Sequence, residues 1–117
     1  MTYKLISISA LTIALNLTTA AVAAGDPATG EQKANTLCIS CHGPKGISTM
    51  PVVPGMTVPN LAGQYADYLA KALKDYRSGA RNNPSMTGMS AGLTDEDIEN
   101  LAAYFSSLEG LSVVNPE

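Results

Sequence analysis

The sequence predicts an all-α domain with three main helices. Two segments, residues 64–78 and 94–108, carry apolar side chains at helical spacing, and a third, residues 26–38, opens with helix-capping residues. No segment shows the convincing alternation of a β-strand. Prolines and glycines crowd the stretches 43–63 and 81–92, where we expect irregular loops. A loop of about 20 residues is unusual in a compact domain, so it should wrap a rigid object.

The first expected helix begins at Asp26, because aspartate is a favoured N-cap and Pro27 suits the first helical position. It runs towards Cys38. Gly30 lies inside it, at a cost of about 1 kcal/mol relative to alanine. A glycine at this position suggests that another backbone approaches closely.

The second and third helices are amphipathic. Gly79 is a plausible stop for the second, and Gly110 ends the third. Thr94 caps the third helix, with Asp97 three residues on and an acidic first turn that suits the helix dipole. The apolar stripes consist of Tyr65, Tyr68, Leu69, Ala72, Leu73 and Tyr76, and of Ile98, Leu101, Ala102, Phe105 and Leu108.

Residues 1–23 have the pattern of a secretory signal peptide. The positive Lys4 precedes a mostly apolar run and then a stretch of small residues. The motif Ala21-Val22-Ala23 places cleavage after Ala23, with a competing site after Ala24. We therefore expect export to the bacterial periplasm.

A membrane anchor is the alternative, because residues 5–24 approach the ~20 residues of a membrane span. The polar residues near its end, Asn16, Thr18 and Thr19, and the small residues that follow argue against an anchor. We expect no stable membrane insertion after cleavage. The domain then comprises residues 24–117.

The expected domain is acidic and poor in large side chains. Residues 24–117 hold ten acidic and six basic side chains, a net charge of −4. This balance argues against nucleic acid or an anionic membrane as a partner. With one Phe, four Tyr and no Trp in this stretch, its core is marginal. Something other than these side chains should therefore fill the middle.

The segment Cys38-Ile39-Ser40-Cys41-His42 is the motif that carries chemistry. It contains every cysteine and histidine of the chain. The Cys-x-x-Cys-His pattern is typical of covalent haem c attachment. One tight turn presents both sulfurs to the two vinyl groups of the ring, and the next residue, His42, lies beneath the iron.

Three other interpretations compete with haem attachment. A redox Cys-x-x-Cys pair requires a preceding strand, which is not predicted. A structural zinc site needs four ligands, and the cluster offers three. A plain disulfide leaves both the long loop and the thin core unexplained.

Two histidine ligands within one chain are impossible, because His42 is the only histidine, so the candidates for the second axial position are methionine, lysine or no residue. Met50 and Met56 lie in the first loop, on the same side of the sequence as His42. Met86 and Met89 lie far along the chain, in a stretch that can cross to the opposite ring face. A thioether ligand favours ferrous iron and raises the reduction potential.

These residues resemble the class I c-type cytochromes over nearly the whole of residues 24–117. The matching segments are Gly30-Glu31 through Gly43, Pro59-Asn60-Leu61-Ala62-Gly63-Gln64, Leu93-Thr94-Asp95-Glu96-Asp97-Ile98 and Leu101-Ala102-Ala103-Tyr104-Phe105. The resemblance implies a small cytochrome c fold, similar to one half of the dihaem periplasmic cytochromes. It departs from them in having one haem motif instead of two.

The resemblance also assigns roles to single residues. The Pro59 carbonyl would accept a hydrogen bond from His42, and Gly30 would pack against the last helix near Leu101 and Tyr104. In the similar subgroup the axial methionine lies seven residues before the leucine at the start of the last helix. Counting back from Leu93 gives Met86 in preference to Met89.

The expected function is single-electron transfer between periplasmic or membrane-bound redox proteins, without catalysis. Tyr68 and Leu61 are expected to line the haem pocket, and Arg81, Asn82 and Asn83 either face the propionates or form a solvated loop. A haem subunit of a larger dehydrogenase is the alternative. An open-site gas sensor or peroxidase is a further alternative, which the methionine-bearing stretch disfavours.

Overall fold

The computed structural model describes residues 25–51, 55 and 57–110. The predicted signal peptide, both cleavage positions and Met56 lie outside these residues. The helices are α1 (Pro27–Leu37), α2 (Ile39–His42), α3 (Ala66–Ser78), α4 (Pro84–Ser90) and α5 (Asp95–Ser107), with one 3₁₀ turn, η1 (Pro44–Gly46). The described part of the chain forms no strand, as expected of an all-α domain, and none of its helices is long and apolar enough to span a bilayer.

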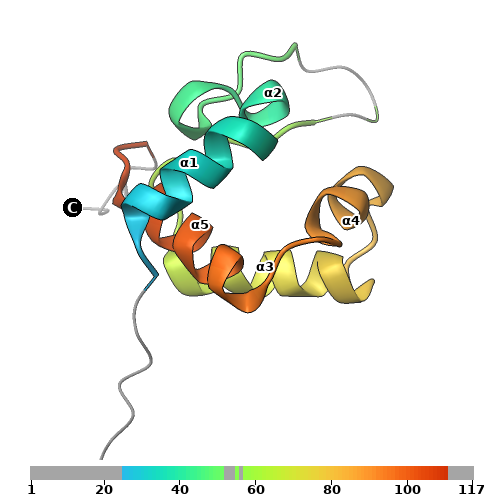
Figure 1. Ribbon diagram of the computed structural model, residues 1–117. Helices are drawn as coiled ribbons and strands as arrows, with labels where there is room; N and C mark the ends of the chain where they lie inside the picture. The colour runs from blue at the N-terminus through green and yellow to red at the C-terminus, as the bar shows by residue number, and fades with distance from the viewer. Residues whose placement is uncertain (1–24, 52–54, 56, 111–117) are drawn as a thin grey trace, which may run out of the picture.

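Helix α1 packs across α5, and their contact is unusually close (Figure 1). The Asp26 side chain caps α1 by accepting from the backbone N–H groups of Ala28 and Thr29. A Cβ built on Gly30 would lie 2.0 Å from the Asn100 carbonyl oxygen and 2.9 Å from Tyr104 Cβ. The close backbone approach predicted from Gly30 is therefore present. It centres on Asn100 and Tyr104.

Helix α5 lies between α1 and α3 and supplies most of the core. Its N-terminus carries the predicted capping box, in which Thr94 and Asp97 exchange side-chain-to-backbone hydrogen bonds. Ion pairs join α5 to both neighbours: Lys33–Asp97, Lys74–Glu99 and Arg77–Asp95. The buried apolar side chains that form this core cluster are Ala34, Leu69, Ala70, Leu93, Ile98, Leu101, Ala102, Tyr104 and Phe105.

The prediction that residues 81–92 are irregular was wrong. Pro84 to Ser90 form α4, which packs against α3 (Figure 1). Asn83 is the N-cap, and its Oδ1 accepts from the Met86 N–H at 3.1 Å. Pro84 takes the first helical position, where its missing N–H costs nothing. The same pair, an aspartate or asparagine cap followed by proline, starts α1. Gly88 inside the segment made the helix hard to recognise in the sequence.

The long loop after α2 is irregular over most of its described residues, as predicted, apart from η1. It is held on the domain by backbone hydrogen bonds. The N–H groups of Leu61 and Ala62 donate to the Gly46 carbonyl at 2.8 and 3.3 Å, and the Gly63 N–H donates to the Phe105 carbonyl at 2.9 Å. This loop runs beside the Cys-x-x-Cys-His segment.

Candidate functional site

The Cys-x-x-Cys-His segment consists of Cys38, which ends α1, and the single turn of α2. The N–H groups of Cys41 and His42 both donate to the Cys38 carbonyl, at 3.2 and 2.9 Å. The Gly43 N–H then donates to the Ile39 carbonyl at 3.0 Å, and Gly43 leaves the helix with φ of 74°. Only glycine adopts this conformation at low cost, so Gly43 ends the turn directly after the histidine.

The structure brings His42 and Pro59 together. His42 is 7% exposed, and its Nδ1 lies 2.9 Å from the Pro59 carbonyl oxygen. A carbonyl oxygen only accepts hydrogen bonds, so Nδ1 carries the proton and donates. In the neutral imidazole with its proton on Nδ1, the other ring nitrogen, Nε2, has the lone pair that binds a metal. This hydrogen bond also fixes the ring orientation.

The two cysteine thiols occupy different environments. Cys41 is exposed, whereas Cys38 is partly buried against the core. Burial, and then the neighbouring Cys41, raise the pKa of the Cys38 thiol to about 11. Disulfide oxidoreductases lower the pKa of their attacking cysteine instead. The environment of Cys38 therefore does not suit a thioredoxin-like exchange reaction.

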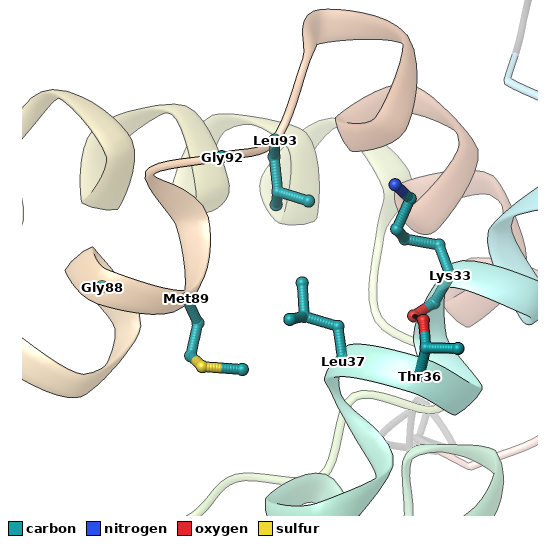
Figure 2. Close-up of a pocket in the computed structure, with 7 residues that line it drawn as sticks. All are labelled: Lys33, Thr36, Leu37, Gly88, Met89, Gly92 and Leu93. Atoms are coloured by element: carbon teal, nitrogen blue, oxygen red, sulfur yellow. Dashed lines mark hydrogen bonds between the residues drawn. The ribbon is translucent and has the colours of Figure 1, made fainter.

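A cavity of about 460 Å³ opens directly beside this turn. One wall is the last two turns of α1, with Leu37 next to Cys38, and the other is the end of α4 and the segment before α5 (Figure 2). Its size falls in the range of small-molecule and cofactor sites, which is about 300 to 1,000 Å³. Its lining consists of Lys33, Thr36, Leu37, Gly88, Met89, Gly92 and Leu93.

The lining fits a large, flat, apolar group. Leu37, Leu93 and Met89 extend into the cavity from opposite sides in Figure 2. A Cβ added to Gly88 or Gly92 would meet no atom within 4 Å, so both glycines border open space. Leu37 lines the cavity and directly precedes Cys38 in the chain, whereas the cysteines and His42 are not themselves among its lining residues.

The two methionines of α4 differ in their surroundings. Met89 lines the cavity and is 40% exposed, whereas Met86 is half-buried and is not among the lining residues. They are three residues apart on one helix and hence on neighbouring parts of the same face. Met50, the described methionine of the first loop, is half-buried, and its N–H donates to Ser48 Oγ at 3.3 Å.

Several residues expected near the pocket lie elsewhere. Tyr68 is 49% exposed, and its hydroxyl accepts a hydrogen bond from Arg81 at 3.3 Å. The Arg81 guanidinium also lies 4.9 Å from the centre of the Tyr76 ring. Leu61 packs against the core instead of lining the cavity, and Asn83 caps α4.

The α1 wall, formed by Lys33, Thr36 and Leu37, was not anticipated. Its sequence signal is weak. The three residues share one helix face at the i, i+3, i+4 spacing and immediately precede the cysteines.

Comparison with known proteins decides the family. The cytochrome c family profile matches residues 27–109. The chain belongs to the cytochrome c family. Among its relatives, cytochrome c-554(548) of Halomonas halodenitrificans is 48% identical over 89 residues, which cover 74% of this chain and 100% of that protein. The family accounts for the motif, the cavity and the helical fold together.

Other relatives of this cytochrome are longer. Cytochrome c4 of Thiocapsa roseopersicina is 44% identical over 88 residues, covering 75% of this chain and 43% of the relative. The crystal structure of reduced recombinant cytochrome c4 from Pseudomonas stutzeri superposes with a TM-score of 0.58 at 33% identity, over 73% of this chain and 50% of that chain. The chain thus spans about half the length of the cytochrome c4 relatives. The cofactor of this cytochrome c domain is one covalently attached haem c.

Proposed function

We propose that this cytochrome c domain carries single electrons on its haem c, between redox proteins of the bacterial periplasm, and acts as a carrier instead of an enzyme. The observation that supports this most directly is the His42–Pro59 contact, which lies close in the chain to Leu37 on the wall of a mostly apolar cavity. It orients a metal-binding nitrogen next to two thiols that can anchor a ring. Haem iron supplies a one-electron couple when bound at such a site.

Each residue of the turn has a distinct part in this proposal. Cys38 and Cys41 hold the ring through thioether bonds, so the cofactor stays with an exported protein. Nε2 of His42 would bind the haem iron, and the Pro59 carbonyl would hold the proton on Nδ1. The same hydrogen bond would keep the imidazole in one orientation, which suits a carrier of electrons.

Met86 is proposed as the second axial ligand. Its amide is fixed by Asn83 at the start of α4, the helix whose end lines the cavity opposite α1. The spacing to Leu93 in the related cytochromes supports Met86, whereas the lining of the cavity in this structure supports Met89. A rotation of α4 about its axis would exchange the two, because they are neighbours on one face.

The surroundings of the ring exclude water from one side. Leu37 and Leu93 provide apolar walls, and Lys33 at the rim is paired with Asp97 at 3.0 Å. An electron carrier needs no general acid or base, and the described lining supplies none beyond this paired lysine. We propose that donor and acceptor proteins meet an exposed edge of the ring.

The assignment of the second ligand is tested with Met86→Leu and Met89→Leu, which conserve side-chain volume. In the Met86→Leu protein, the weak far-red band of sulfur-ligated ferric haem should disappear. The reduction potential should fall by on the order of 0.2 V, a fraction of the about 0.8 V range that axial ligands span. The Met89→Leu protein should keep the band and a potential near that of the parent.

The matched pair separates the outcomes. Loss of the far-red band in the Met89→Leu protein alone would assign the second ligand to Met89 instead of Met86. A parent protein that has no such band, and binds carbon monoxide fully without displacing a ligand, would contradict the electron-carrier proposal and favour an open-site gas sensor or peroxidase.

A further inference from the structure

We infer that Asn60 is a positioning residue for His42, acting through the loop that presents the Pro59 carbonyl. The inference rests on the proposed function, since it concerns how the proposed haem ligand is held. It extends that proposal to a residue that touches neither His42 nor the cavity lining. The argument concerns how a carbonyl in an irregular loop is kept at hydrogen-bond distance from a buried ring.

Pro59 has few constraints of its own. It is exposed and lies in a loop without regular structure, and as a proline it has no N–H with which to anchor itself. Its carbonyl nevertheless lies 2.9 Å from His42 Nδ1. The constraint must therefore come from its neighbours in the loop.

Asn60 supplies the nearest constraint. Its Oδ1 accepts a hydrogen bond from the Ser48 N–H at 2.8 Å. This bond links the residue directly after Pro59 to the irregular segment that follows η1. Ser48 is in turn linked to the haem-attachment turn, because its hydroxyl donates to the Cys41 carbonyl at 3.4 Å. The side chain of Asn60 thus joins the loop to the backbone that carries His42.

Further backbone hydrogen bonds hold the residues that follow Asn60. Leu61 and Ala62 both donate to the Gly46 carbonyl, and Gly46 has a φ of 69° that suits glycine. On the other side, the Gly63 N–H donates to the Phe105 carbonyl at the end of α5. The segment from His42 to Ser48 and the segment from Asn60 to Ala62 are therefore held together directly after the Pro59 carbonyl.

Apart from the His42–Pro59 bond itself, the side-chain bond that joins these two segments next to Pro59, within the described residues, comes from Asn60, and the others are backbone bonds that substitution leaves in place. Losing it frees Pro59 to drift from His42 while the fold persists. A weaker hydrogen bond at Nδ1 makes the imidazole a less basic ligand, which stabilises ferric iron less. The reduction potential should then rise.

The test compares three variants of the haem-bearing protein. Asn60→Leu removes the acceptor at similar size, Asn60→Asp keeps an acceptor oxygen, and Asn35→Ala replaces an exposed asparagine on α1 as the control. The first readout is solvent exchange of the His42 Nδ1 proton, followed by NMR on the reduced protein. The second is the reduction potential.

We expect Asn60→Leu to speed the exchange about tenfold, of the order expected for opening one hydrogen bond, and to raise the potential. Asn60→Asp should exchange like the parent, and its added negative charge should lower the potential, which is the opposite sign. Asn35→Ala should match the parent in both.

Equal exchange rates in Asn60→Leu and Asn35→Ala would overturn the inference. So would an Asn60→Asp protein that behaves like Asn60→Leu. Failure of the proposed function is visible separately, because a parent protein without a histidine-ligated haem would show it before any variant is made.

Discussion

Replacing Gly30 by alanine should destabilise the domain, although alanine is the better helix former. A Cβ at this position would lie 2.0 Å from the Asn100 carbonyl oxygen and 2.6 Å from its carbon. Both are backbone atoms of α5, so neither can rotate out of the way. The helices would have to move apart by more than 1 Å, because carbon and oxygen atoms pack at about 3.5 Å.

The size of the effect follows from three contributions. Forcing a methyl group into a packed contact costs about 1–3 kcal/mol, and a backbone clash belongs at the upper end of that range. Separating the helices also endangers the hydrogen bond from the Asp26 N–H to Asn100 Oδ1, 2.7 Å long, which contributes about 1 kcal/mol. Alanine regains about 1 kcal/mol in helix propensity. The expected net loss is about 2–3 kcal/mol.

Urea unfolding of the haem-bearing protein, followed by circular dichroism, measures this change. With a slope near 1.5 kcal/mol per molar urea, typical of small domains, the midpoint should fall by about 1.3–2 M. Gln32→Ala, on the exposed side of α1, is the control and should stay within about 0.5 kcal/mol of the parent. A Gly30→Ala protein as stable as the parent, or more stable, would refute the close packing of α1 on α5.

Two further predictions concern the helix starts. Hydrogen bonds from the Thr94 backbone, followed by the Lys33 ammonium, hold the pKa of Asp97 below its usual value of 3.8. A lowered folded-state pKa gives stability that is present above the unfolded value and lost as pH falls through the folded one. Asp97→Asn should therefore flatten the fall of the urea midpoint between about pH 5 and pH 2, and an unchanged slope would contradict this role. Asn83→Ala should cost α4 about 1 kcal/mol through its lost N-cap, seen as about fivefold faster amide exchange in that helix with α5 unaffected. Amide exchange in α4 at the same rate in the Asn83→Ala protein as in the parent would count against the cap.

The haem motif was predictable because its chemistry is local. Two cysteines and a histidine within five residues define the attachment site whatever the rest of the chain does. The same holds for the starts of α1 and α5, where Asp26 and Thr94 bond to their own first turns. The residues of each such signal are at most four positions apart in the chain, so the signal does not depend on the tertiary fold.

The cavity wall and the α4 helix were harder to predict for opposite reasons. Leu37 and Lys33 line the cavity because of how α1 is rotated on α5, and that rotation is set by the glycine contact between the two helices. Helix α4 was masked by Gly88, which reads as a helix breaker but borders open space in the structure. A residue that leaves room for a cofactor and a residue that ends a helix look alike in the sequence.

The placement of α4 has a consequence for the order in which the domain opens. This helix packs on α3 and faces α1 across the cavity, which its residues Gly88 and Met89 line (Figure 2). Ser90 at its end is fully buried, and its hydroxyl has no hydrogen-bond partner among the described residues. One side of the cavity is therefore carried by α3 through α4, and the other by α1, which packs on α5. A ligand proposed on α4 would then be released by local opening of that helix, ahead of global unfolding.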